Sequence, residues 1–116
     1  MSTSDEPSGR TAAARTLIET YFERAIDADR ESYVALFADD VVVEDEGLER
    51  HGVAAVREWR AEVPPVTYAL RAVVPESDTW VATASVAGDF PGSPVDLTFR
   101  FRFDREGKIG ELRIRS

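Results

Sequence analysis

Residues 21–47, YFERAIDADRESYVALFADDVVVEDEG, carry the signals for two helices and a strand in one continuous stretch. The stretch begins inside an apolar stripe with 3, 4, 3, 4 spacing, which predicts a helix over residues 11–28. Asp29 is a suitable N-cap for a second, short helix over residues 31–37. The valine run then predicts a strand over residues 40–45.

Strands dominate the second half of the chain. After the polar loop GLERHG, apolar residues at helical spacing from Val53 to Val63 mark a third helix, which Pro64 and Pro65 end. Segments of strand character between turn sequences predict four strands, at residues 66–74, 79–88, 95–103 and 109–115. Helices that lead into hairpin-connected strands indicate an α+β domain, in which a curved antiparallel sheet wraps a helical layer.

The length and composition fit one folded domain. We assign residues 10–116 to it, and residues 1–9, rich in Ser, Asp, Glu and Pro, to a disordered leader. The polar start has no secretory pattern and no apolar run reaches membrane-spanning length, so we expect a cytoplasmic protein without a membrane partner. The formal net charge of -8 would repel a phosphate backbone, which argues against nucleic acid as a partner.

Few residues suit metal or thiol chemistry. The chain has no cysteine, which excludes disulfides and thiolate catalysis. Its single histidine, His51, precedes Gly52 at the entry to the third helix, where it is either a polar loop residue or a catalytic group. One histidine among scattered acids has no recognisable ligand spacing, so we expect no metal and no cofactor.

The predicted strand at residues 95–103 alternates almost without interruption. Side chains alternate along a strand, which divides this one into Leu97, Phe99, Phe101 and Phe103 on one face and Thr98, Arg100 and Arg102 on the other. The phenylalanine face is either plain core or the wall of a ligand pocket. The arginine face is either solvated and paired with some of the excess acids, or an interface with a partner subunit.

The same alternation singles out one acid in VVVEDE. The two faces are Val41, Val43 and Asp45, and Val42, Glu44 and Glu46. We expect the two glutamates to be solvated, whereas Asp45 extends the more apolar face. A carboxylate against an apolar wall is desolvated and binds a proton more readily, which suits a general base. The alternative is a strand-end aspartate that turns into solvent.

Three aromatic residues are candidates for the core or for a pocket wall. Tyr21 lies within the apolar stripe of the first helix, so its hydroxyl either donates to a ligand oxygen or binds a backbone carbonyl in the core. Trp59, on the inward stripe of the third helix, serves as core and pocket wall together. Trp80 stays unassigned because both faces of its strand carry small or apolar residues.

The opening stretch, followed by HGVAAVREW, resembles the first half of the nuclear transport factor 2-like superfamily, and in particular its SnoaL-like polyketide cyclase and ketosteroid isomerase branches. The tail LTFRFRFDREGKIGELRIRS is similar to the last two strands of that fold, so the resemblance covers roughly residues 15–116. It implies a cone-shaped (cystatin-like) α+β fold with three N-terminal helices on a curved, mainly antiparallel sheet. It also implies a homodimer.

The ketosteroid isomerase pattern carries over onto two positions. Its general-base aspartate, in the segment VED, matches Asp45, and its oxyanion-stabilising tyrosine matches Tyr21, 24 residues earlier. The resemblance implies that Asp45 removes a proton alpha to a carbonyl and returns it elsewhere, while the Tyr21 hydroxyl stabilises the dienolate oxygen.

The sequence departs from that pattern at three positions. The family's second oxyanion donor, a protonated carboxylic acid, is replaced by Phe99, and its two supporting tyrosines are replaced by Phe37 and Arg60. Losing one donor costs about 3 to 4 kcal/mol of transition-state stabilisation. The resemblance to SnoaL-like cyclases implies a less demanding site, which needs only an acid/base aspartate in an apolar cone that folds an aromatic or polyketide substrate.

Two hypotheses follow. The first is an enzyme that moves a proton on a small apolar or aromatic carbonyl compound, with Asp45 and Tyr21 catalytic and with Phe37, Trp59, Phe99 and Phe101 forming or filling the ligand pocket. The second is a noncatalytic module that binds an apolar ligand, or dimerises through the outer sheet face bearing Thr98, Arg100 and Arg102.

Overall fold

The computed structural model describes residues 5–116. Helix α1 (Asp5–Ala25) begins before the predicted start at Thr11, so residues 5–9 of the predicted leader are helical, while residues 1–4 lie outside the described part. Within the described residues, no helix is long and apolar enough to cross a membrane.

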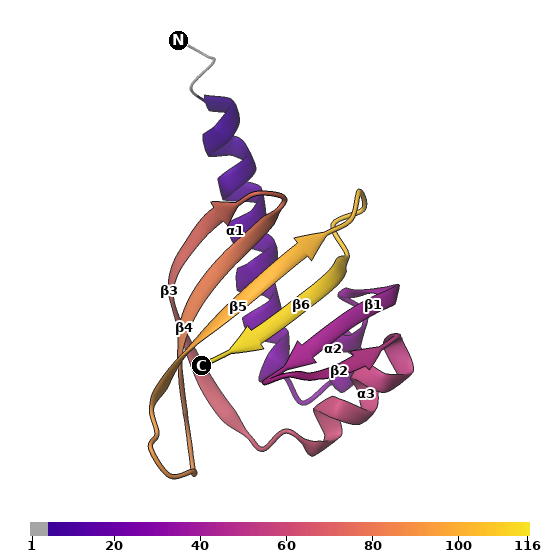
Figure 1. Cartoon of the computed structure of the whole chain (residues 1–116), viewed down its shortest axis with the longest axis vertical. Coiled ribbons are helices and arrows are strands. Elements are labelled where there is room, and N and C mark those ends of the chain that lie inside the picture. The colour runs from indigo at the N-terminus through magenta and orange to yellow at the C-terminus, as the bar shows by residue number, and fades with distance from the viewer. Residues whose placement is uncertain (1–4) are drawn as a thin grey trace.

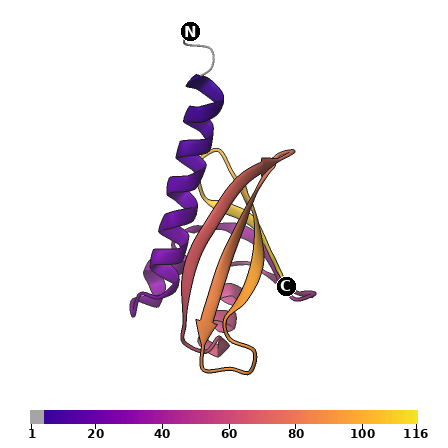
Figure 2. The ribbon, with the colours of Figure 1, turned by 90° about the vertical axis from the view of Figure 1, so that its left-hand side faces the viewer.

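One face of α1 packs on the sheet, as its apolar stripe predicted. Ile18 and Tyr21 are fully buried, and Phe22 is nearly so. The stripe ends before Ile26, which is 58% exposed because the helix has already ended at Ala25. Figure 2 shows α1 running along one side of a curved sheet.

The second helix is shorter than predicted. Asp29 caps α2 (Arg30–Val34), as expected, and its Oδ1 accepts from the Glu31 backbone N–H at 3.2 Å. Strand β1 (Phe37–Asp45) then starts earlier than predicted, because Phe37 already pairs with Ile109 of the last strand.

The loop predicted at GLERHG contains a strand. Glu46 and Gly47 have φ values of 50° and 90°, as a two-residue hairpin turn of primed type requires, and β2 (Leu48–His51) returns antiparallel to β1. Sequence pattern missed β2 because LERH has no apolar alternation. Helix α3 (Val53–Glu62) follows, and ends before Pro64 as predicted.

The remaining strands lie where the sequence predicted them, with only the first extended. They are β3 (Val66–Glu76), β4 (Thr79–Gly88), β5 (Val95–Phe103) and β6 (Ile109–Arg115). The six strands form one sheet in the order β2-β1-β6-β5-β4-β3 (Figure 1), in which only β1 and β6 are parallel. All three predicted helices are present, but α2 has only five residues, and the unpredicted β2 lies with β1 between α2 and α3.

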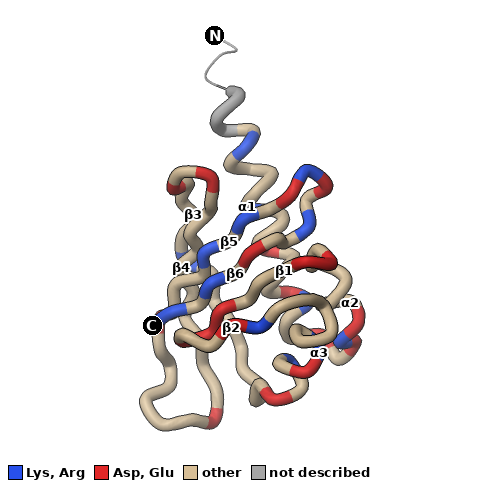
Figure 3. Tube along the Cα trace, turned by 45° about the vertical axis from the view of Figure 1, so that its right-hand side comes forward, with Lys and Arg blue, Asp and Glu red and all other residues tan. Residues whose placement is uncertain are grey.

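The two faces of β5 differ as predicted. Phe99 and Phe101 are buried against α1, with their ring centroids 6.2 and 5.1 Å from that of Tyr21. On the outer face, Arg100 forms an ion pair with Glu76 and Arg102 forms one with Glu111. Figure 3 shows blue basic and red acidic segments on the neighbouring strands β5 and β6. Across the pair with β4, the inner face carries Ala82, Ala84 and Val86, which places Trp80 on it too.

Glu44 is not the solvated charge that alternation predicted. Its exposure is only 7%, because the guanidinium groups of Arg113 and Arg115 on β6 cover its carboxylate on the outer face. The hydrogen bonds from Arg115 and Arg113 hold the pKa of Glu44 below its ordinary value. Neighbouring strands therefore decided the burial of this acid.

Candidate functional site

An apolar cavity of about 250 Å³ lies between the inner face of the sheet, α1 and α3. Most of its wall is aliphatic or aromatic, from Val63, Pro64, Val66, Val86, Phe90, Val95, Leu97, Phe99 and Ile114. The remaining lining residues carry polar groups: Tyr21, Asp45, Trp59, Arg60 and Tyr68. A few polar groups in an apolar hollow are typical of a small-molecule site.

Asp45 enters the cavity from the end of β1. It is the last residue before the tight Glu46–Gly47 turn, and it shares the inner face with the fully buried Val41 and Val43. Its Oδ2 accepts a hydrogen bond from Trp59 Nε1 at 3.0 Å. Among the described residues, Oδ1 has no hydrogen-bond donor. The strand-end aspartate therefore lies against the cavity instead of turning away into solvent.

Tyr21 reaches the same cavity from α1. Its hydroxyl lies 3.0 Å from that of Tyr33, on α2, and both rings are buried. Burial raises the pKa of Tyr21 well above its ordinary range, and burial likewise raises the pKa of Tyr33. Both hydroxyls therefore keep their protons near neutral pH. One proton serves the bond between them, which leaves the other free to point elsewhere.

Arg60 brings a positive charge to the cavity wall. Its guanidinium carbon lies 4.5 Å from the Tyr33 ring centroid and 5.2 Å from that of Trp59. Arg60 Nη2 donates to the backbone oxygen of Ala25, the last residue of α1, at 3.0 Å. Tyr68 interacts with the same guanidinium. A cation at a helix C-terminus is favourable because the helix dipole is negative there.

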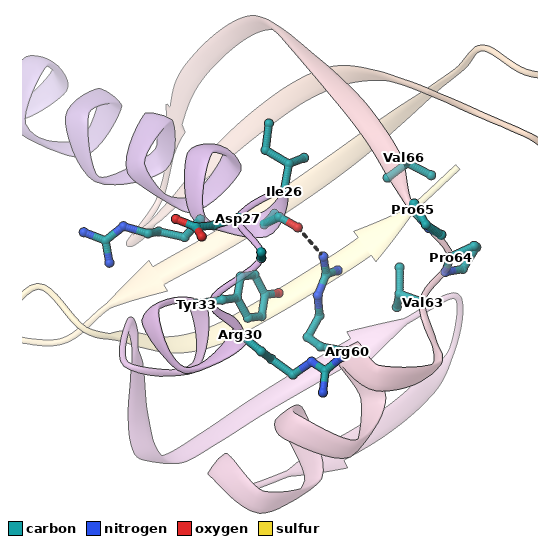
Figure 4. A pocket seen from close by; sticks show the side chains of 12 residues that line it. Ile26, Asp27, Arg30, Tyr33, Arg60, Val63, Pro64, Pro65 and Val66 are labelled. Atoms are coloured by element: carbon teal, nitrogen blue, oxygen red, sulfur yellow. Dashed lines mark hydrogen bonds between the residues drawn. The ribbon is translucent and has the colours of Figure 1, made fainter.

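A second hollow, of about 270 Å³, adjoins the apolar cavity along Arg60, Val63, Pro64 and Val66 (Figure 4). We call it the arginine hollow; its lining is Arg24, Ala25, Ile26, Asp27, Ala28, Arg30, Tyr33, Arg60, Val63, Pro64, Pro65 and Val66. Figure 4 shows Arg60 extending from α3 past the Tyr33 ring towards the end of α1.

A glycine lets the β4–β5 loop fold over the cavity. A Cβ atom on Gly88 would lie 2.9 Å from Val66 Cγ1, closer than real Cβ contacts, and 3.1 Å from Phe90 Cε2, which is tighter than most of them. The Gly88 backbone N–H also donates to Ser93 Oγ at 2.9 Å. The absence of a side chain at position 88 therefore leaves room for the Val66 and Phe90 side chains in their present positions.

The structure separates the predicted pocket residues into two groups. Trp59 and Phe99 line the apolar cavity, whereas Phe101 is fully buried in the core and Phe37 packs against Tyr21 and Tyr33 instead. These two phenylalanines belong to the core because Phe101 packs on the Tyr21 ring and Phe37 on the Tyr21 and Tyr33 rings, away from the cavity wall. His51 is exposed, beside Glu49, and is not part of the cavity wall.

Two polar members of the site were not assigned from sequence. Tyr33 was missed because its helix is too short to show a full apolar stripe; an aromatic beside Val34 was the only signal. Tyr68 alternates with exposed residues on β3 and offered no distinct pattern. Arg60 was noted only as a replacement for a tyrosine.

Comparison with known proteins places the chain in a family. Residues 18–112 match the family model of the SnoaL-like domain. A candidate polyketide cyclase, protein SMa1630 from Sinorhizobium meliloti, is 32% identical, with a TM-score of 0.79 over 86% of this chain and 94% of that chain. A search of the curated proteins found no match.

Two more distant structures share the fold. The epoxide hydrolase/cyclase-like enzyme SalBIII, which acts in pyran ring formation in polyether salinomycin, has a TM-score of 0.77 at 20% identity, over 89% of both chains. A protein with a ketosteroid isomerase-like fold from Catenulispora acidiphila, in complex with trimethylamine, has a TM-score of 0.73 at 16% identity, over 86% of this chain and 84% of that chain. Together with the family match over most of its length, these likenesses show that the chain has a nuclear transport factor 2-like fold and belongs to the SnoaL-like domain family.

Proposed function

We propose that the protein is an enzyme that moves a proton on a small hydrophobic carbonyl compound. The observation that carries this proposal is the shared cavity of Asp45 and Tyr21, whose wall is otherwise largely apolar. A carboxylate and a hydroxyl donor that face one apolar space are the two groups that proton abstraction next to a carbonyl needs.

Asp45 is the proposed acid/base. Trp59 holds Oδ2, so Oδ1 is the oxygen that takes the proton from the carbon alpha to the carbonyl. The electron pair of that C–H bond forms the enolate double bond, and the carbonyl oxygen takes the negative charge. After Asp45 has exchanged its proton with solvent, return to the same carbon completes an exchange, and return to another carbon completes an isomerisation. When the enolate carbon instead attacks a second carbonyl and closes a ring, Asp45 gives the proton to the alkoxide oxygen that this attack forms.

Tyr21 is the proposed donor to the enolate oxygen. When Tyr33 donates its proton to the Tyr21 oxygen, the Tyr21 proton is free for the ligand, and the charge that develops there is spread over both hydroxyls. Phe99 supplies no second donor at this wall. The proposed reaction is therefore one that tolerates the absence of a donor at position 99, which favours a carbonyl substrate with relatively acidic alpha hydrogens.

Deuterium exchange tests this proposal without knowledge of the natural substrate. 2-Tetralone, a bicyclic ketone with acidic alpha hydrogens, is incubated with the protein in D2O, and loss of the alpha-proton signal is followed by NMR. We expect the wild type to accelerate exchange, Asp45→Asn to lower that rate at least about a hundredfold, and Tyr21→Phe to lower it roughly a hundredfold.

Asp40→Asn is the matched control, because Asp40 lies exposed on the same strand and outside the apolar cavity. Its exchange rate should equal that of the wild type. Equal rates for the wild type and Asp45→Asn, with both proteins folded by circular dichroism, would remove Asp45 from the chemistry.

A noncatalytic module of the same fold is the second candidate, and Phe99 favours it. This residue is 2% exposed and places a ring where a second oxygen donor would stand. Such a module would bind an apolar ligand or form a homodimer through the outer sheet face with Thr98, Arg100 and Arg102. Light scattering of the wild type and an Arg100→Glu/Arg102→Glu variant tests the dimer: we expect a dimer that the variant converts to a monomer.

A further inference from the structure

Within the part of the chain that the structure describes, three arginine side chains line the arginine hollow without forming ion pairs, although the chain as a whole is acidic. Arg24, Arg30 and Arg60 line it, and Asp27 is its only acidic lining residue. Among the described residues, none of these three arginines has a carboxylate oxygen within ion-pair distance, although the chain carries 22 acids and 14 Lys and Arg residues. The hollow is therefore positive in a protein whose formal net charge is -8.

Arg60 is the member that connects this charge to the proposed site, since it lines the arginine hollow and the apolar cavity alike. Neither carboxylate in these walls forms an ion pair with Arg60: Asp45 accepts from Trp59 through Oδ2, and Asp27 Oδ1 accepts from the Asp29 backbone N–H at 2.9 Å. A guanidinium has five N–H donors in a planar fork. One of them binds the Ala25 carbonyl and the Tyr68 hydroxyl also interacts with the guanidinium, so donors remain for a ligand.

We propose that Arg60 binds a carboxylate group of the ligand, so that the preferred ligand is an aromatic or polycyclic acid and not a neutral compound. The ring system would occupy the apolar cavity, and the carboxylate would lie at the Arg60 edge, where the cavity adjoins the arginine hollow. A carboxylate matches the guanidinium fork with two parallel hydrogen bonds. This inference rests on the proposed function only in taking the apolar cavity as the ligand site.

A purely structural role for Arg60 makes a different prediction. Its bond to Ala25 and its position over the Tyr33 ring would hold the end of α1 against α2 and α3 whether or not a ligand is charged. In that case its replacement would change stability and would weaken acidic and neutral ligands equally. Only a role in binding changes the ratio of the two affinities.

The test compares 2-naphthoate with 2-naphthamide, which has nearly the same shape but no charge, by calorimetric titration at neutral pH. We expect the wild type to bind 2-naphthoate roughly ten to a hundred times more tightly than the amide. Arg60→Gln removes the charge and the fork of donors and should reduce that ratio to about one. Arg57→Gln, on the outer side of the same helix, should leave the ratio unchanged, because Arg57 pairs with Glu31 and lines neither hollow.

Each outcome decides between the possibilities. Equal affinities of the wild type for the two probes, or a preference that survives in Arg60→Gln, would overturn the inference, and binding of neither probe would overturn it as well. If Arg60→Gln fails to fold, the wild-type ratio and the Arg60→Lys variant, which keeps the charge without the fork, still decide it. Asp45-dependent exchange of 2-tetralone without a preference for 2-naphthoate refutes this inference alone, whereas the reverse result refutes the proposed function alone.

Discussion

Trp59 donates a hydrogen bond from its indole nitrogen to Asp45 across 3.0 Å, and thereby joins α3 to the end of β1 at the cavity wall. The bond fixes one carboxylate oxygen and leaves the other for a ligand. It also gives the buried indole N–H a partner, since Trp59 is only 3% exposed. Trp59 is in this sense a positioning residue for Asp45.

Trp59→Phe should therefore affect both stability and activity. Phenylalanine keeps an aromatic ring but donates no hydrogen bond to the carboxylate, which should lower the free energy of unfolding by about 1 to 3 kcal/mol. Exchange of 2-tetralone should also slow, because Asp45 is then free to turn away. Urea unfolding and the exchange assay measure the two effects. Trp80→Phe serves as the control for exchange, because Trp80 lines neither the apolar cavity nor the arginine hollow. A Trp59→Phe protein with full exchange activity would contradict the positioning role.

The buried hydroxyl pair of Tyr21 and Tyr33 should show strong coupling. Each single change to phenylalanine leaves the other hydroxyl buried with a lost partner, at a cost of about 1 to 3 kcal/mol. Removing both hydroxyls leaves neither one buried without the other as its partner. The double variant should therefore lose less stability than the two single variants combined. Chemical denaturation of the four proteins gives the coupling free energy. Simple additivity would show that the two hydroxyls do not depend on each other.

Glu44 should make stability depend on acid pH. The Arg115 and Arg113 side chains hold its pKa in the folded protein below the ordinary value of 4.5. Its contribution to stability is therefore fully present above that ordinary value and is lost as the pH falls through the lower, folded pKa. The difference in unfolding free energy between the wild type and Glu44→Gln should be largest near neutral pH and should shrink in acid. Glu58→Gln, exposed on α3, should show no such trend.

The buried tyrosine pair should make the protein less stable at alkaline pH, whereas Glu44 makes it less stable in acid. Burial raises the pKa of Tyr21 and Tyr33 above the ordinary value of 10.0, so the folded protein holds protons that the unfolded chain releases. Stability from these groups is complete below about pH 10 and is lost as the pH rises above it. The Tyr21→Phe/Tyr33→Phe variant should lose less stability than the wild type between about pH 9 and pH 11. Identical slopes for the two proteins would contradict the burial of these hydroxyls.

Local periodicity was enough for most of the fold. The alternation of β5 and the bounds of β4 and β6 follow from residues that are neighbours in sequence, because a strand exposes every second side chain to the same environment. It was not enough for β2, whose residues LERH carry no alternation. That strand exists because the turn at Glu46 and Gly47 returns the chain to the edge of β1.

The site was predictable only in part, for the same reason. The position of Asp45 beside two inward valines, at the family's distance from Tyr21, indicated the pair that lines the cavity. Sequence alternation could not indicate that Glu44 is covered, because the arginines that cover it come from β6, a strand far away in sequence.

The amino-acid sequence thus determined which side chains face inward, since that depends on periodicities within one element. The tertiary structure alone decided which of those side chains meet: Trp59 with Asp45, Tyr33 with Tyr21, and Arg60 with the end of α1. Hydrogen bonds and charge interactions act over a few ångströms in space. Partners that are 12, 14 or 35 residues apart in the chain therefore become partners only when the helices pack on the sheet.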